Sequence, residues 1–304
     1  MIGNIIAGTL SSSALPPKFD VLVIAGGGGA LGENGGGAGA GGVFYATDQA
    51  LTGGSSYTVT IGAGGTGSKI NASVTAGSDS TFTGLTAAKG GGKSNQIKIG
   101  TNLDGGSGGA TNDANTIGGA SNQTSTGGTG YGNSAGTTYN WTPNNFATIA
   151  GGGGAGAVGG TSTSTNAGNG GVGTSVFSSW GAATSSGELS GGTYYYAGGG
   201  GGSYDNRGPG TTLGIGGLGG GGAGTLGSTP GVSGTANTGG GGGGNGYVSA
   251  GGLSANGGNG GSGLLILRTS TAGYTATATT GSPTRYETGG FVYYKFTGSG
   301  SITI

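Results

Sequence analysis

The side chains able to act as acids, bases or nucleophiles are few and widely spaced in this 304-residue chain. No two of its nine carboxylates lie within five residues of each other, and it contains no histidine and no cysteine. Glycoside hydrolysis needs two carboxyl groups roughly 5–10 Å apart, which folding can bring together but this spacing does not indicate. The commonest general base and the thiolate metal ligands are also missing. We therefore expect a non-catalytic protein without a metal or cofactor.

Two patterns resemble ligand sites and are explained by composition. Gly214, Gly216 and Gly219 spell a G-x-G-x-x-G dinucleotide fingerprint, but such matches are expected by chance when 89 residues are glycine. The fingerprint also needs a preceding strand and a following helix, which this segment does not indicate. Asp104 and Asp113 lack the closely spaced ligands of calcium loops, so Asx turns are the favoured interpretation there.

The charges are balanced and dispersed. Nine Lys and Arg residues offset nine Asp and Glu residues, and only 6% of the chain is charged. Nucleic-acid binding uses clustered basic side chains, so we expect no nucleic-acid partner. No run of about 18 apolar residues is present and the N-terminal residues do not resemble a signal peptide, so we expect a soluble, unprocessed product without membrane insertion.

Aromatic side chains and one arginine are the candidates for a surface-binding or interface role. Tyrosine offers a large, rigid surface that stacks on sugars and anchors interfaces. The same rings can instead wedge between packed segments or across a subunit interface, and the sequence leaves both interpretations open. The candidates are Tyr194, Tyr195, Tyr196, Tyr204, Arg207, Trp141 and Trp180.

Strand patterns lie toward the two ends of the chain. Short apolar or alternating runs occur at 19–26, 43–51, 56–64, 80–88 and 263–269, and residues 270–304 alternate like a closing hairpin region. Because the first and last of these runs are far apart in sequence, a small antiparallel β-sandwich must pair the ends of the domain around a long insertion.

The insertion, residues 89–262, is dominated by glycine runs such as the six at 239–244. Glycine disfavours both helix and ordinary sheet. A flexible linker is one interpretation. The other is an ordered set of polyproline II helices, which pack closely without Cβ atoms and exchange backbone hydrogen bonds. The interleaved aromatic residues favour the ordered arrangement, so the predicted fold class is all-β with polyproline-II-type packing and essentially no α-helix.

The order of elements carries a resemblance. FDVLVIAGGGG, GGAGAGGVFYA, YTVTIGAGG, DSTFTGLTAAKGGG and GGNGGSGLLILR follow one another between residues 19 and 269. This succession resembles the glycine-rich domain of bacteriophage tail fibres and related adhesins. The resemblance implies a β-scaffold with glycine-rich loops in a virion appendage that touches the host. The partner expected there is the host cell surface, through a glycan or an outer-membrane protein. The Asn/Thr/Ser-rich segment 94–148 departs from simpler members.

Residues 1–18 form a segment too short to fold alone, with apolar side chains at Ile2, Ile5, Ile6 and Leu10. We expect it to dock onto other virion structural proteins or onto copies of itself. A chain that buries so little apolar area gains from intersubunit contacts, since Leu, Ile, Val and Phe total only 47 of 304 residues. We therefore expect a homo-oligomer, with a trimer as the leading form.

The function expected from these features is a phage tail-fibre or adhesin subunit located on the virion. The alternatives are a capsid-decorating fibre without a specific receptor, a bacterial surface filament and an ice-binding protein. Threonines such as Thr161, Thr163 and Thr165 are too few and irregular to favour the last.

Overall fold

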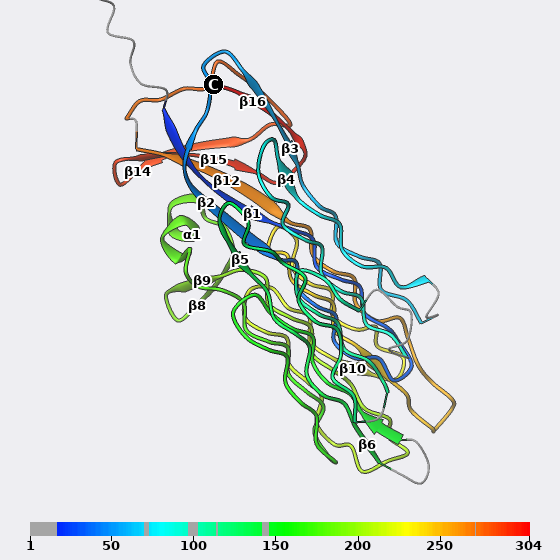
Figure 1. Ribbon diagram of the computed structural model, residues 1–304. Helices are drawn as coiled ribbons and strands as arrows, with labels where there is room; N and C mark the ends of the chain where they lie inside the picture. The colour runs from blue at the N-terminus through cyan, green and yellow to red at the C-terminus, as the bar shows by residue number, and fades with distance from the viewer. Residues whose placement is uncertain (1–16, 70–72, 97–102, 114, 142–145, 271) are drawn as a thin grey trace, which may run out of the picture.

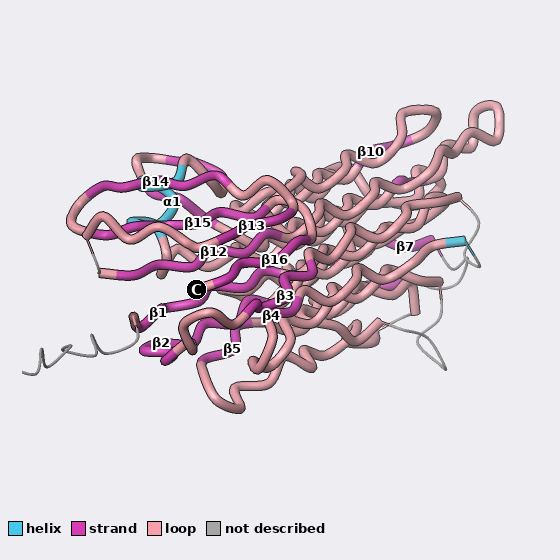
Figure 2. The backbone as a smooth tube through the Cα atoms, turned by 90° about the horizontal axis from the view of Figure 1, so that it is seen from above, coloured by secondary structure: helices cyan, strands magenta, loops and turns pink. Residues whose placement is uncertain are grey.

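The computed structural model describes residues 17–304 except 70–72, 97–102, 114, 142–145 and 271. A β-sandwich occupies one end of the molecule, and long glycine-rich segments run side by side from it toward the opposite end (Figures 1 and 2). The predicted all-β class is confirmed. The larger sheet has six strands in the order β14-β15-β12-β1-β2-β5. Their bounds are Thr284–Thr288, Phe291–Phe296, Leu264–Thr269, Lys18–Ile24, Val43–Ala50 and Thr129–Tyr131.

The second sheet has four strands in the order β13-β16-β3-β4. Their bounds are Ala278–Thr280, Gly300–Thr303, Ser56–Thr60 and Thr81–Phe82. Three two-stranded ladders lie outside the sandwich: β6 (Tyr139–Trp141) with β7 (Phe146–Thr148), β8 (Glu188–Ser190) with β9 (Thr193–Tyr195), and β10 (Thr225–Leu226) with β11 (Asn245–Gly246).

The ends of the glycine-rich region meet in the larger sheet, as predicted. β1 and β12 are antiparallel neighbours, with Asp20 opposite Arg268. The Arg268 guanidinium donates to the Asp20 carboxylate at 2.5 Å and lies 4.5 Å from the ring of Trp180. Between these two strands the chain alternates between the sheets, to which it contributes β2, β3, β4 and β5, and glycine-rich segments that leave the sandwich and return to it.

Both faces of the larger sheet are covered, which explains the continuous apolar run in β1. Val21 and Val23 pack into the core between the two sheets, whereas Leu22 and Ile24 point to the other face. That face is covered by Phe177 and Trp180 at the helix α1 (Ser178–Thr184). This seven-residue helix is the single α-helix in the described part of the chain, and the sequence did not predict it.

The C-terminal residues complete both sheets. β14 and β15 form the expected hairpin, closed by Gly289 and Gly290 at φ of 60° and 81°. Two positive φ values match the primed turns that suit the twist of antiparallel strands. β16 instead pairs with β3 in the smaller sheet, and β13 pairs with β16. The tail thus supplies four strands to the sandwich.

The glycine-rich insertion forms an ordered bundle, in agreement with the polyproline II prediction and against a flexible linker. Along residues 37–42, which precede the insertion, successive backbone N–H groups donate in rotation to three segments of the insertion. N–H groups three residues apart donate to the same neighbouring segment, which is the period of a helix with three residues per turn. The carbonyl acceptors, in order from residue 37 to residue 42, are Ala150, Gly242, Gly92, Gly153, Gly239 and Lys89.

The helices approach so closely that side chains are excluded from many positions. A Cβ atom on Gly27 would lie 2.1 Å from the carbonyl oxygen of Gly240 in a neighbouring helix. Where room exists, small apolar side chains fill it, and Ala110, Ala135 and Ile149 form a buried cluster inside the bundle. Glycine is therefore the packing residue of this region, and backbone hydrogen bonds link the helices.

The segment 94–148 is integrated into this architecture. Its β5 pairs with β2 as the sixth strand of the larger sheet. Between its described ends, Gly108 donates to the carbonyl of Asn133 at 2.9 Å and Gly119 donates to that of Gly109 at 2.8 Å. The segment thus adds polyproline II helices to one side of the bundle and an edge strand to the sandwich.

Candidate binding surface

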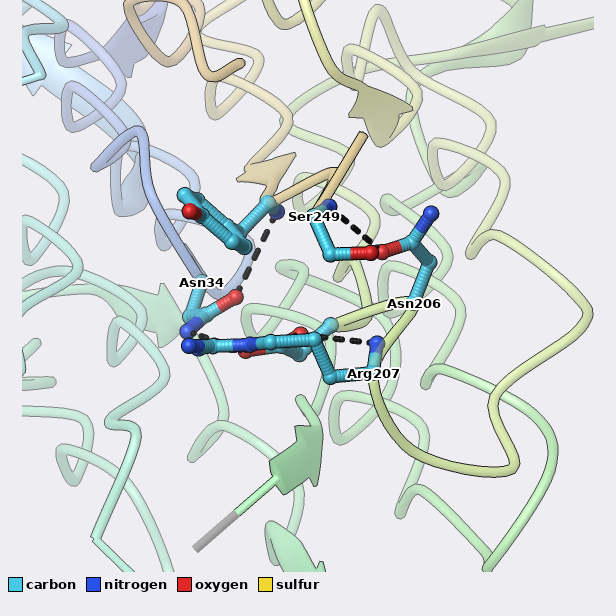
Figure 3. Close-up of polar contacts among 6 residues, drawn as sticks. Asn34, Asn206, Arg207 and Ser249 are labelled. Atoms are coloured by element: carbon cyan, nitrogen blue, oxygen red, sulfur yellow. Dashed lines mark hydrogen bonds and ion pairs between the residues drawn. The ribbon is translucent and has the colours of Figure 1, made fainter. Parts of the chain in front are cut away.

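Loops at the end of the bundle opposite the sandwich form a polar cluster, which we call the distal cluster. Its members are Asn34, Asp205, Asn206, Arg207, Tyr247 and Ser249. They come from three turns that each join glycine-rich helices, at residues 31–35, 204–210 and 245–254 (Figure 3). The polyproline II helices fix the positions of these turns, because the ends of each turn are held by interhelical hydrogen bonds.

Asp205 is the buried anchor of the distal cluster, and its side chain has no exposed surface. Its carboxylate accepts hydrogen bonds from the Arg207 side chain and backbone and from Asn34 Nδ2 at 3.0 Å. Burial acts to raise the pKa of Asp205, but these hydrogen bonds outweigh it and hold the pKa below the ordinary value. The loop therefore carries a permanently ionised carboxylate at neutral pH.

Arg207 connects this buried anchor with the surface. Its guanidinium pairs with Asp205 and lies 4.4 Å from the centroid of the Tyr247 ring. The hydrogen bond to Asp205 raises the pKa of Arg207, so the group stays cationic. Its side chain keeps 40% of its surface exposed. Charge, an aromatic face and a planar donor are thus displayed together in a fixed geometry.

The adjacent turns are held by the buried amide of Asn245. Its Nδ2 donates to Thr225 Oγ1 at 3.1 Å and to the carbonyls of Gly227 and Thr229 at 3.2 and 2.8 Å. Its Oδ1 accepts from the backbone N–H of Ala255 at 2.7 Å. Asn245 is a positioning residue that sequence reasoning missed. The available signal was a single Asn at the end of the longest glycine run, where a helix must end and a turn begin.

Two neighbouring turns complete the distal cluster. The amide oxygen of Asn206 accepts from the backbone N–H of Ser249 at 2.8 Å, and the Asn206 N–H donates to the carbonyl of Tyr247 at 3.1 Å. Asn34 has φ of 68°, in the left-handed region that asparagine tolerates better than most residues. The distal surface is therefore made of loops tied to each other by side-chain amides.

The aromatic candidates from the sequence separate into two places. Tyr204 and Arg207 lie at the distal end, whereas Tyr194, Tyr195 and Tyr196 lie in or beside β9, next to α1 and the sandwich. Ala197 turns the chain with φ of 59°, and the six residues 198–203 then join the two groups as an extended segment, which spans about 19 Å at 3.1 Å per residue. A single surface formed by all five residues is therefore ruled out.

Two of the candidates are corrected from surface residues to core residues. Tyr196 has no exposed surface, and its hydroxyl bonds to Ser186 Oγ at 2.9 Å. Trp180 is 3% exposed and packs edge-on against Tyr45 and Tyr293. Both cover the second face of the larger sheet, because that face is apolar and needs a partner layer.

The remaining candidates are partly exposed or lie outside the described part. Tyr194 and Tyr204 are half-buried, and Tyr195 borders a cleft near the sandwich. Trp141 belongs to β6, but its side chain lies outside what the structure describes, as do Ile2, Ile5, Ile6 and Leu10.

Among the residues that the structure describes, no three His, Cys, Asp or Glu side chains lie close enough together to hold a metal ion. Within the same part of the chain, the helical structure includes no segment of the length and hydrophobicity needed to span a bilayer.

The fold and the distal cluster define a β-sandwich protein that holds loops on a polyproline II bundle. A sequence profile described as a glycine-rich domain matches residues 6–270, and the chain belongs to this glycine-rich domain family. No curated protein matches the chain.

Proposed function

We propose that this protein is a non-catalytic structural component of a virion, a tail-fibre or adhesin subunit whose distal loops attach to a host surface. The observation that carries the proposal is that the start of β1 and the C-terminal residue lie at one end of the molecule and the distal cluster lies at the other. β1 begins beside the end of β2, and the carbonyl of the last residue, Ile304, accepts from Gly54 in the adjacent turn. Both lie at the sandwich end, opposite the distal cluster (Figure 1).

Such polarity suits an attachment protein. The sandwich end is free to join the rest of an appendage, while the bundle holds its loops at a distance on a stiff support. Ordered loops bind at a smaller entropic cost than flexible ones, because they are already fixed before contact. Arg207, Tyr247 and Ser249 then provide the cation, the aromatic face and the polar groups that recognise a glycan or an outer-membrane protein.

The N-terminal residues and the oligomeric state belong to the same proposal. Ile2, Ile5, Ile6 and Leu10 dock on other virion proteins or on other copies, and the subunit assembles as a homo-oligomer, with a trimer as the leading form. Deletion of residues 2–17 is expected to abolish incorporation into virions. Light scattering over a wide concentration range is expected to give a mass above that of the monomer, and a monomer at all concentrations would contradict the assembly.

The attachment role is tested by adding bulk to the distal surface. Ser249 is exposed, so Ser249→Arg leaves packing intact but obstructs contact by the loops. Ser56→Arg places the same side chain at the exposed start of β3, at the other end. Host-cell binding by fluorescently labelled protein is expected to be lost with Ser249→Arg and kept with Ser56→Arg. Equal binding by both variants would contradict attachment through the distal loops.

The second candidate is a fibre that decorates the capsid without a specific receptor, since the same polarity suits any projecting subunit. Gold-labelled protein imaged on virions separates a tail from a capsid location. Absence of the label from virions would remove both candidates and favour a bacterial surface filament.

A further inference from the structure

A cleft at the junction of the sandwich and the bundle has the chemistry of a binding site. It has a volume of about 490 Å³, within the range of ligand pockets. Four segments line it: residues 130–133 at the end of β5, 155–156, 172–176, and Tyr195 in β9. We call it the junction cleft, and it is separate from the distal cluster.

No charged side chain lines the junction cleft. Its lining instead combines two tyrosines, an asparagine, hydroxyl-bearing Thr174 and Ser175, and two valines. Val176 is 65% exposed and Val172 is 40% exposed, so apolar surface faces solvent beside polar groups. An anionic ligand finds no cation here, and a fully apolar ligand leaves the polar groups unpaired.

The polar groups of the lining have hydrogen-bonding capacity left for a ligand. Asn133 Nδ2 donates to the carbonyl of Gly154 at 2.9 Å, which orients the amide and leaves its Oδ1 as an acceptor without a bond from another described residue. Among the residues described, the hydroxyls of Tyr131 and Tyr195 likewise form no hydrogen bond. Each can both donate and accept.

Contacts with neighbouring elements hold the walls of the cleft in place. The ring of Tyr131 stands edge-on against Phe177, at a centroid distance of 5.8 Å and an interplanar angle of 90°. Tyr195 is held by the pairing of β9 with β8, opposite Glu188. Gly156 donates to the carbonyl of Val172 at 3.0 Å, which joins two of the lining segments. A ligand therefore meets a site that needs little ordering on binding.

From this combination we propose that the junction cleft binds an uncharged saccharide. Sugar rings carry C–H faces that pack on aromatic rings and valine methyl groups, and hydroxyls that exchange hydrogen bonds with phenol and amide groups. Tyr195 would supply the stacking surface and Asn133 and Tyr131 the polar contacts. The inference rests on the proposed attachment function for its biological setting, and it adds a ligand class and a second site to it.

The test uses the full chain and a panel of neutral sugars: glucose, galactose, rhamnose, N-acetylglucosamine, N-acetylgalactosamine and their disaccharides. Saturation-transfer NMR identifies binders and calorimetry gives their Kd. Tyr195→Ala removes the stacking surface, and Val176→Trp fills the cleft from an exposed position. Tyr195→Ala is expected to weaken binding about tenfold through the loss of one stacked ring, and Val176→Trp to weaken it about tenfold or more because the indole occupies the space of the ligand. Tyr139→Ala, at an exposed tyrosine of β6, is the matched control and is expected to bind within about twofold of the parent.

Absence of binding by every sugar in the panel would overturn the inference, as would unchanged affinity in Val176→Trp, whose exposed position preserves folding if Tyr195→Ala does not fold. The two proposals fail separately. Normal host-cell binding without any sugar binding contradicts the junction cleft alone, whereas sugar binding without host-cell binding contradicts attachment alone.

Discussion

Gly37 lies against the backbone of Gly200 so closely that a Cβ atom on Gly37 would be 1.8 Å from the Gly200 carbonyl oxygen. The two residues belong to helices far apart in sequence that are neighbours inside the bundle. The next residue, Ala38, accepts a hydrogen bond from the Gly200 N–H at 2.9 Å, so the contact is a hydrogen-bonded packing of two backbones. Contacts of this kind hold the bundle together where side chains are absent.

Gly37→Ala is therefore expected to destabilise the protein by about 3 kcal/mol or more, because backbone on the facing helix has to move. Gly53→Ala is the matched control. No heavy atom lies within 4 Å of its added Cβ, and its φ is not positive. We expect the free energy of unfolding of this variant to stay within about 1 kcal/mol of the parent, with any change in the stabilising direction. Urea denaturation of both variants checks the prediction, and equal midpoints would contradict it.

The buried amide of Asn245 gives a second prediction with its own control. Asn245→Asp replaces a donor by a carboxylate oxygen that faces Thr225 Oγ1 and two carbonyls. The cost is expected to be about 3 kcal/mol or more, since a buried charge is left without a partner. Asn206 is exposed, and Asn206→Asp keeps the oxygen that accepts from the Ser249 N–H. Its effect on the free energy of unfolding is therefore expected to be below about 0.5 kcal/mol. Thermal denaturation of both variants measures these effects. A similar loss of stability in both would argue against a structural role for the Asn245 donor.

The Asp205 carboxylate makes the distal cluster sensitive to acid. Its pKa in the folded state is lowered from 3.8. The ionised Asp205 therefore stabilises the folded protein at pH values above the pKa that Asp205 has in the unfolded chain. This stabilisation is lost as the pH falls through the pKa of Asp205 in the folded state. Asp205→Asn is expected to lower the Tm at pH 7, and the difference from the parent is expected to shrink below about pH 4. A constant difference in Tm from pH 7 to pH 2 would show that the charge is not its source.

Tyr196 gives the opposite pH dependence. Burial raises its pKa from 10.0 to about 12, against the lowering effect of its hydrogen bond with Ser186. Its contribution to stability is complete below pH 10 and is lost as pH rises toward 12. Tyr196→Phe is expected to cost about 1 kcal/mol at pH 7 through the lost hydrogen bond, and to lose less stability than the parent above pH 10. Denaturation curves at pH 7 and pH 11 measure both effects, and parallel losses at high pH would contradict the assignment.

The β-sandwich could be predicted from the sequence because its strands carry local side-chain patterns. Alternation in 56–64 and the apolar runs at 19–26 and 263–269 reflect how many faces of each strand are covered. Helix α1 could not be predicted, since its sequence SSWGAAT is short and contains glycine. Trp180 of this helix packs on the larger sheet. Tertiary packing there outweighs weak local propensity.

The candidate binding residues show where local pattern stops being informative. Tyr196 and Tyr204 are close in sequence, yet an extended helix carries one into the core and the other to the distal end. Arg207 meets Tyr247 and Asp205 meets Asn34 only through the lateral packing of the bundle.

The residue patterns predict two kinds of structure, strands toward the chain ends and close-packed glycine helices between them, because side-chain alternation and the lack of Cβ atoms act over a few residues. Tertiary packing sets which helices are neighbours, and hence which side chains share a surface. Contacts between glycine backbones are chemically alike and leave no distinguishing mark in the residues that make them.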